Sequence, residues 1–227
     1  MSTGSPSGPP ALRARTLYRF YRAGEEETLA LQGVSLTVGR GEFVAVVGPS
    51  GSGKSTLLAC LAGMDDPDGG SVHIDGRRIS HQPEPVRARI RARHVGMLFQ
   101  NANLLEHLTV AENLTLVRGL ARRRTRTSGA ALLDSLAVGH RAPAYPSQLS
   151  GGELARAGLA IALANEPTVL IADEPTGELD SVTESGVLDL LAAAAEGGTA
   201  IVVASHSPAV AVAAARVITL EDGRVRR

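Results

Sequence analysis

Short, continuously apolar runs recur along the chain and predict buried strands. Four of them have the length of a strand and no polar alternation, which indicates strands covered on both faces. They are Phe43–Val47, Val95–Phe99, Val169–Ala172 and Ala200–Ala204, and a further β pattern lies at Val217–Leu220. Helical patterns at Leu154–Ala164 and Val182–Ala195 alternate with these runs. The alternation predicts an α/β fold with a mostly parallel sheet between helices.

The first forty residues and residues 71–79 carry the patterns of antiparallel strands. Three strand-like segments precede the first buried run, at Thr16–Tyr21, Thr28–Leu31 and Val34–Val38. An acidic turn, Gly24–Glu27, joins the first two segments. A small hairpin is predicted where Asp75-Gly76 separates Ser71–Ile74 from Arg78–Ile79. The chain is therefore expected to have an N-terminal antiparallel β subdomain beside the parallel sheet.

Three segments are predicted to lie outside both sheets. Residues 1–11 are rich in Ser, Gly and Pro, which is typical of a disordered lead-in. Val86–Arg93 has arginine at alternate positions and is interpreted as a solvated segment, with a contact to an acidic partner as the alternative. Residues 101–154 are helical in pattern with breakers at Gly139 and Pro146, so they are predicted to form an inserted helical subdomain.

A glycine-rich stretch directly follows the first buried run. It reads Gly48, Pro49, Ser50, Gly51, Ser52, Gly53, Lys54, Ser55 and Thr56, and it fits the pattern G-x-x-x-x-G-K-[ST]. This motif needs a buried strand before it and a helix after it, and the helical pattern from Lys54 to about Gly63 supplies the second. The glycines allow backbone N–H groups to face an anion, Lys54 can reach the β- and γ-phosphates, and the Ser55 hydroxyl can ligate Mg²⁺. The stretch predicts a P-loop NTPase core, against the alternative of an ordinary glycine-rich loop.

The basic residues single out the same position. The chain has 23 Lys and Arg residues, and Lys54 is the one lysine among them. A compact ammonium on a flexible stem suits a phosphate loop, whereas a planar guanidinium does not. A drift towards arginine codons explains the bias elsewhere in the chain but not this exception.

Acidic and imidazole side chains follow two other buried runs. Asp173 and Glu174 come directly after Val169–Ala172, and His206 comes shortly after Ala200–Ala204. In a parallel sheet, ligands bind at the carboxyl ends of the strands, beside the phosphate loop. Asp173 is therefore predicted to hold Mg²⁺ through water and Glu174 to polarise an attacking water, with a helix-capping pair as the alternative. His206 is placed to sense the γ-phosphate, although a lone histidine is more often structural.

A second anion site is predicted at the start of a later helix. Ser150, Gly151 and Gly152 precede the helical pattern Leu154–Ala164, and backbone groups at a helix N-terminus bind anions. Two phosphate-binding helix starts, about a hundred residues apart, are explained if each site completes the other in a dimer.

From about residue 13 to residue 227, the ordered motifs resemble those of the nucleotide-binding subunits of ABC transporters. Residues 48–56 are similar to the Walker A loop, residues 149–153 to the family signature and residues 169–174 to the Walker B motif. The resemblance implies these roles: catalytic glutamate for Glu174, Q-loop residue and Mg²⁺ ligand for Gln100, switch histidine for His206, D-loop aspartate for Asp180 and adenine-stacking aromatic for Tyr21. From the residues alone, sheet packing is the alternative for Tyr21.

The resemblance also implies a function. Residues 12–227 are expected to form an ABC ATP-binding domain that binds ATP and Mg²⁺ and hydrolyses ATP by positioning and charge stabilisation. Two copies, or this chain and a paired ABC subunit, are expected to associate head to tail, so that Ser150 and Gly152 of one close over the triphosphate held by Lys54 and Ser55 of the other. The expected location is the cytoplasmic face of a membrane, with Gln100 linking the site to a membrane-spanning permease subunit.

Several phrases point to one branch of the family, and three positions depart from its pattern. The phrases Gly96–Gln100, Asn103–Leu105, Leu108–Asn113 and Asp173–Gly177 are similar to those of lipoprotein-releasing, macrolide-exporter and cell-division ATPases. The departures are Glu153 where Gln is common, Ile161 where many relatives have Arg, and Ser207 where Asp is usual. Glu153 brings a negative charge towards the nucleotide of a second copy.

Net charge, the length of apolar runs and cysteine content argue against several other classes of protein. The net charge is zero, so no nucleic-acid partner is predicted. No apolar run approaches the roughly eighteen residues that a membrane span needs, and the N-terminus lacks a signal pattern. The single cysteine, Cys60, is predicted to pack inside a cytosolic protein. Two alternative functions are an ABC module that regulates or scaffolds a membrane or cell-wall complex, and a soluble ABC ATPase of DNA repair or translation. The short insertion and the single cassette argue against the second.

Overall fold

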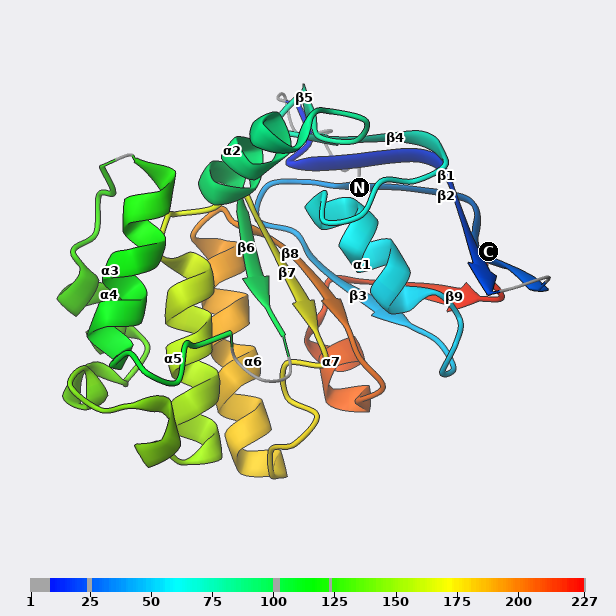
Figure 1. Cartoon of the computed structure of the whole chain (residues 1–227). Helices are drawn as coiled ribbons and strands as arrows, with labels where there is room; N and C mark the ends of the chain where they lie inside the picture. The colour runs from blue at the N-terminus through cyan, green and yellow to red at the C-terminus, as the bar shows by residue number, and fades with distance from the viewer. Residues whose placement is uncertain (1–8, 24–25, 100–102, 123, 227) are drawn as a thin grey trace, which may run out of the picture.

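Two sheets form the framework of the computed structural model, which describes residues 9–23, 26–99, 103–122 and 124–226 (Figure 1). The antiparallel sheet has the strand order β2-β1-β4-β5, and the second sheet has the order β10-β9-β3-β8-β7-β6. The antiparallel strands are β1 Leu12–Ala23, β2 Glu26–Val38, β4 Gly69–Ile74 and β5 Arg77–Arg78. The others are β3 Phe43–Val47, β6 Val95–Leu98, β7 Val169–Asp173, β8 Ala200–Ala204, β9 Arg216–Glu221 and β10 Arg224–Val225.

The second sheet is parallel from β9 to β6, and β10 pairs antiparallel with β9. Its central strands are buried on both faces, because successive residues enter different hydrophobic clusters. On β3, Val44 and Val46 join the cluster that includes the antiparallel sheet, whereas Phe43 and Ala45 join the cluster on the far side. This explains why the strands read as continuous apolar runs, and the predicted α/β fold with a mostly parallel sheet is confirmed.

Helices cover both faces of the parallel sheet. Helix α1, Lys54–Ala62, lies between the two sheets (Figure 1), and α5, Gly151–Leu163, and α6, Ser181–Glu196, contribute to the cluster on the other face. The short α7, Pro208–Ala213, lies before β9. Gly63 ends α1 in the left-handed region, as predicted, and Cys60 is buried inside it. Burial raises the pKa of the Cys60 thiol to about 12, so Cys60 serves as a packing residue.

The chain between β6 and α5 is helical, as predicted. It contains α3, Val110–Ala121, and α4, Gly129–Ser135, followed by the 3₁₀ turns η1, Gly139–Arg141, and η2, Pro146–Gln148. Helix α3 begins with a capping box between Thr109 and Glu112. The buried amide of Asn113 donates to the carbonyls of Leu105, Leu108 and Thr109, so it fixes the loop that leads into α3.

Val86–Arg93 contains no buried residue, as predicted for a solvated segment, but the segment is helical. The chain forms helix α2, Glu84–His94, whose start is fixed by Pro83 and Pro85. Arg87 pairs with Asp66 at 2.7 Å, and Arg91 donates to the Gly63 carbonyl at 2.7 Å. Polar side-chain contacts thus join α2 to the end of α1, and Ile90 adds an apolar contact with the core.

The antiparallel sheet extends beyond the predicted segments. The segments Thr28–Leu31 and Val34–Val38 are one strand, β2, because Gly33 adopts a φ of 75° and keeps the chain paired with β1 through register shifts. The predicted hairpin of β4 and β5 is present. Ala11, assigned to the lead-in, is fully buried, and its carbonyl accepts from the Asp75 amide. In the part of the chain that the structure describes, no helix has the length and apolar character that a membrane span demands.

Candidate nucleotide-binding site

The loop between β3 and α1 has a backbone that only glycine allows at two positions. Gly48 has φ of 156°, and a Cβ there would lie 2.0 Å from the Leu220 carbonyl oxygen. Gly53 has φ of 99°, and a Cβ there would lie 2.4 Å from the Ala30 carbonyl oxygen. The loop therefore curls against β9 and β2 before the first turn of α1, where free backbone N–H groups can receive an anion.

Lys54 is folded over this loop. Its side chain is buried, and its ammonium donates to the carbonyls of Gly48 at 2.8 Å and Pro49 at 2.9 Å. An ammonium has three donors and no acceptor, so the Lys54 ammonium can bond only to acceptor atoms such as these carbonyl oxygens. Phosphate oxygens can take the place of these carbonyls, which makes Lys54 a ready partner for a phosphate group.

Glu174 is held at the carboxyl end of the parallel sheet by the neighbouring strand. Its Oε2 accepts from the Ser205 hydroxyl at 2.8 Å, and its Oε1 accepts from the His206 amide at 3.1 Å. The His206 Nε2 lies 3.5 Å from the same carboxylate. The backbone of Glu174 is left-handed, with φ of 47°, and its amide donates to Ala204. Strain of this kind, which persists only when the surroundings over-determine it, often accompanies a functional site.

The phosphate loop and the carboxylates face one pocket of about 520 Å³, within the roughly 300–1,000 Å³ range of pockets that enclose a small molecule. The predicted site residues that line it are Tyr21, Ser50, Gly51, Gly53, Lys54, Ser55, Thr56, Asp173, Glu174 and His206. The Tyr21 ring lies under the Arg19 guanidinium at 4.8 Å, and its hydroxyl donates to Asp65 at 3.1 Å. Tyr21 is therefore an oriented aromatic at the rim and not a buried packing residue.

The second predicted anion site lies apart from this pocket. Ser150 caps α5, because its hydroxyl accepts from the Glu153 amide and Glu153 accepts from the Ser150 amide. Asp180 caps α6 by accepting from the Val182 and Thr183 amides, and it also accepts from the Thr183 hydroxyl. Ser150, Gly151, Gly152 and Asp180 do not line the pocket that holds Lys54. Gln100 lies outside the described residues.

Comparison with known proteins identifies the family. The family model described as ABC transporter matches residues 31–177. The chain belongs to the ABC transporter family. It is 44% identical to the ABC transporter ATP-binding protein YbbA of Escherichia coli K12, over 89% of this chain and 91% of YbbA. It is 41% identical to the macrolide export ATP-binding/permease protein MacB of Hyphomonas neptunium, and it spans 34% of that protein's length.

A solved structure gives the same result at the level of the fold. The ABC ATP-binding cassette MJ0796, in a dimeric post-hydrolysis state bound to ADP and Pi, superposes with a TM-score of 0.86 and 36% identity. The superposition covers 95% of this chain and 97% of that cassette. The prediction of an ATP-binding subunit of the ABC transporter type, similar to the macrolide-exporter branch, is confirmed.

The three departures from the ABC pattern have local explanations. Glu153 lies beside Arg141 at 3.0 Å and His140 at 3.4 Å. Hydrogen bonds from Ser150 and His140 and the charge of Arg141 lower the pKa of Glu153 to about 2. Its negative charge is thus compensated within its own chain. Ile161 is buried in the core, and Ser207 caps α7 by accepting from the Ala209 amide.

Sequence patterns alone missed two parts of this ABC site. One wall of the pocket is formed by Thr28, Leu29, Ala30 and Gln32 of β2 and by Asp222-Gly223 of the last turn. The second part is the Ser205 hydroxyl, which was not predicted as a site group. Its position directly before His206, at the end of a buried run, could have indicated it. Ser205 meets Glu174 because β7 and β8 are neighbours in the parallel sheet, and the β2 wall meets the last turn where the Gln32 amide donates to the Gly223 carbonyl.

Proposed function

We propose that this chain hydrolyses ATP in a Mg²⁺-dependent reaction at composite sites between two copies and thereby powers a membrane-spanning partner. The observation that carries the proposal is that Lys54 and Glu174 line one pocket. An ammonium that can donate hydrogen bonds to phosphate and a carboxylate that can act as a general base therefore face the same space. Positioning and charge stabilisation account for most of the catalysis in phosphoryl transfer to water.

The residues of the pocket fit Mg²⁺. The Ser55 hydroxyl and the Asp173 carboxylate both line it. Among the described residues, no group of three or more His, Cys, Asp or Glu side chains could form an all-protein cage. Mg²⁺ typically uses one or two protein ligands and completes its shell with water and substrate phosphates. The ion would neutralise charge on the phosphate oxygens, and Gln100 is proposed as a further ligand.

The protein groups have distinct roles in the proposed reaction. Lys54 exchanges its loop carbonyls for oxygens of the β- and γ-phosphates. Glu174 accepts a proton from the attacking water, while Ser205 and the His206 amide keep the carboxylate in place. The His206 side chain contacts the γ-phosphate, and Tyr21 stacks on the adenine ring. Pro49, Ser52 and Thr56, with the three loop glycines, shape the cradle around the phosphates.

The composite site requires a second copy. Ser150, Gly151 and Gly152 begin α5 at an exposed surface, where they can close over a triphosphate held by another chain, with Asp180 beside them. The dimeric state named for the cassette MJ0796 supports this arrangement.

Wild-type chain and the variant Glu174→Gln provide the test. Steady-state ATPase activity is expected to fall at least a hundredfold in the variant, a typical loss for a general base, and to vanish in excess chelator. Glu196→Gln is the matched control, since Glu196 is exposed at the end of α6. Equal metal-dependent turnover by wild type and Glu174→Gln would contradict the role of Glu174.

The membrane partner is proposed to dock in an apolar groove at the end of β6. This groove, of about 370 Å³, is bordered by Met64, Phe99 and Leu120, whose side chains are 53%, 41% and 66% exposed. Large exposed apolar patches mark interaction sites. Docking there would bring the chain, which contains no predicted span, to the cytoplasmic face of a membrane.

Co-purification with a multi-span membrane protein encoded beside this chain tests the groove. The charge introduced by Leu120→Glu is expected to reduce recovery of the complex at least tenfold. Val212→Glu, at an 86% exposed position on α7, is the control and is expected to leave recovery unchanged. Equal recovery of all three proteins would exclude this groove as the docking site.

A further inference from the structure

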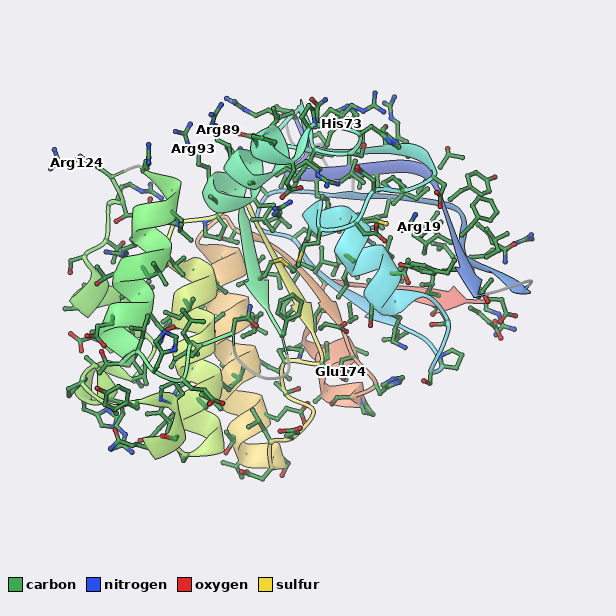
Figure 2. All side chains as sticks on the ribbon, in the orientation of Figure 1. Arg19, His73, Arg89, Arg93, Arg124 and Glu174 are labelled. Atoms are coloured by element: carbon green, nitrogen blue, oxygen red, sulfur yellow. The ribbon has the colours of Figure 1, made fainter. Side chains whose placement is uncertain are left out.

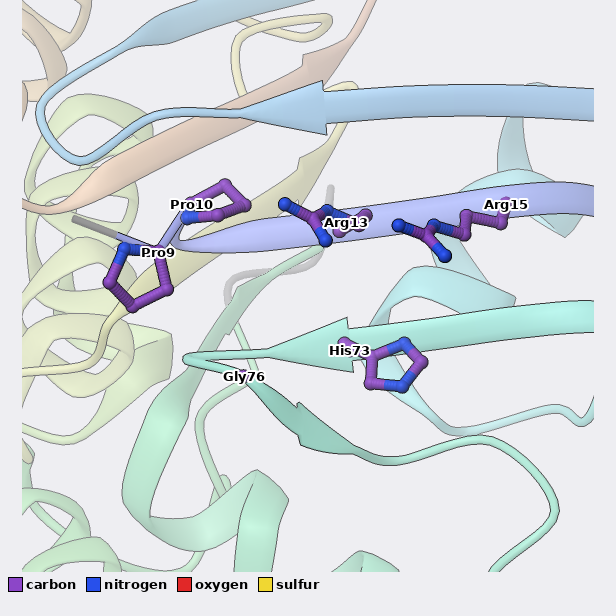
Figure 3. A pocket seen from close by; sticks show the side chains of 6 residues that line it. All are labelled: Pro9, Pro10, Arg13, Arg15, His73 and Gly76. Atoms are coloured by element: carbon purple, nitrogen blue, oxygen red, sulfur yellow. The ribbon is translucent and has the colours of Figure 1, made fainter. Parts of the chain in front are cut away.

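A separate pocket lies on the outer face of the antiparallel sheet (Figure 3). It encloses about 140 Å³ and is lined by Pro9, Pro10, Arg13, Arg15, His73 and Gly76. Figure 2 shows His73 at the upper edge of the molecule, well apart from Glu174. No lining residue is shared with the nucleotide pocket, so the function proposed above does not use this one.

Strand register gathers positive charge at this pocket. Arg13 of β1 lies opposite His73 of β4, and His73 lies opposite Arg78 of β5. Arg15 follows Arg13 by two residues, while the alternate residues Leu12 and Ala14 are buried in the core. Alternation along β1 therefore directs Arg13 and Arg15 to the outer face, beside His73 (Figure 3).

Carboxylates do not neutralise this cluster. Within the described residues, Arg13, Arg15 and Arg78 have no acidic partner, whereas Arg19 on the same strand pairs with Asp65 at 2.9 Å and with Asp68 at 3.2 Å. The nearby Asp75 is paired with Arg40. Arg13 and Arg78 lie on either side of His73, and no carboxylate offsets the repulsion between these like charges on one face of the sheet.

His73 is sensitive to this environment. Its pKa is lowered by burial and then by the charges of Arg78, Arg15 and Arg13. Its Nδ1 is buried and has no hydrogen-bond partner among the described residues. An anion beside Arg13 and Arg15 would offset the repulsion and make the imidazole easier to protonate.

We propose that this pocket binds a single phosphate group. Guanidinium forks match the oxygens of phosphate in bidentate geometry, and two of them border the pocket with an imidazole. The volume is well below the roughly 300–1,000 Å³ of pockets that enclose drug-sized molecules. The pocket therefore suits a phosphate group rather than a whole nucleotide. The group can come from free phosphate or from the headgroup of an anionic lipid.

A nuclear magnetic resonance titration of His73 in the full chain tests the proposal. The variant Lys54→Ala serves as the background, so that phosphate binding at the P-loop does not contribute, and His73→Gln identifies the resonance. Saturating inorganic phosphate is expected to raise the titration midpoint of His73 by about half a pH unit, the effect of a nearby charge in a largely aqueous setting. This response is expected to disappear in Arg13→Gln/Arg15→Gln.

The control is Arg77→Gln, which removes the same charge from the same sheet. Arg77 neither lines the pocket nor figures among the charges that act on His73. It is expected to keep the full response. A response that is equally weakened in Arg77→Gln would overturn the proposal, because it would reflect general charge. Thermal unfolding checks that each variant is folded.

Vesicles distinguish the two sources of the phosphate group. The full chain is mixed with vesicles of phosphatidylcholine, with or without phosphatidylglycerol, and bound protein is measured by flotation. Binding to phosphatidylglycerol vesicles that is lost in Arg13→Gln/Arg15→Gln and kept in Arg77→Gln assigns the pocket to lipid headgroups. A His73 response to inorganic phosphate without such flotation assigns it to free phosphate. The proposal would be overturned if His73 did not respond to phosphate and specific flotation were also absent.

Discussion

At the scale of single residues, the least expected contact is that between Ser205 and Glu174. The hydroxyl is fully buried and its bond to the carboxylate is 2.8 Å long. Hydrogen bonds to charged groups contribute about 1.5–3 kcal/mol. Ser205 is thus a positioning residue for the proposed general base.

Replacing Ser205 tests this positioning role. Ser205→Ala is expected to lower the kcat for ATP about tenfold or more, because about 1.4 kcal/mol of barrier corresponds to tenfold in rate. The KM for ATP should change by less than about twofold, since Ser205 does not line the nucleotide pocket. Ser205→Thr keeps the hydroxyl and should restore turnover. Loss of activity in Ser205→Thr as well, or a change confined to KM, would refute the role.

The same contact shows how far the sequence predicts the site. Lys54 and Ser55 could be predicted because their roles depend on a local strand–loop–helix context. The proximity of Asp173 to the loop followed from a general rule about parallel sheets. The contact between Ser205 and Glu174 joins residues 31 positions apart and depends on β7 pairing with β8, which no local pattern encodes.

At the scale of elements, the start of α5 combines two tasks. The Ser150 hydroxyl caps the helix, and the same exposed turn is proposed to contact the nucleotide of a second copy. Aspartate is as good an N-cap as serine, so Ser150→Asp separates the tasks by adding a charge and keeping the cap.

Turnover of Ser150→Asp is expected to fall at least about tenfold, because its carboxylate would repel the triphosphate of the second copy. ATP binding by the isolated chain and the unfolding temperature should be little changed. Ser128→Asp is the control, since Ser128 is the exposed N-cap of α4 and accepts from the Ala131 amide. Unchanged turnover in Ser150→Asp would argue against a composite site.

At Val86–Arg93 the sequence predicted solvent exposure but not the helix that the structure shows. Helix α2 has no buried residue, so it carries no apolar stripe to read. Its stability comes from Glu84, which pairs with Arg87 and Arg91, and from Arg87 and Arg91 contacts to the end of α1. Such polar contacts depend on tertiary structure, whereas the buried runs of the parallel sheet were visible from hydrophobicity alone.

At the scale of the whole molecule, the two predicted phosphate-binding helix starts lie on different surfaces of one chain. The pocket with Lys54 lacks Ser150 and Gly152, which begin α5 elsewhere. A head-to-tail pair of chains would join them in one composite site.

Sedimentation of Glu174→Gln tests the claim most directly. Without ATP, the 23.5-kDa chain is expected to sediment as a monomer. In saturating ATP and Mg²⁺, blocked hydrolysis should trap two chains around the nucleotide, so the mass should double. Adding Ser150→Asp to Glu174→Gln should return the chain to a monomer. A Glu174→Gln chain that binds ATP yet remains monomeric would contradict the composite site.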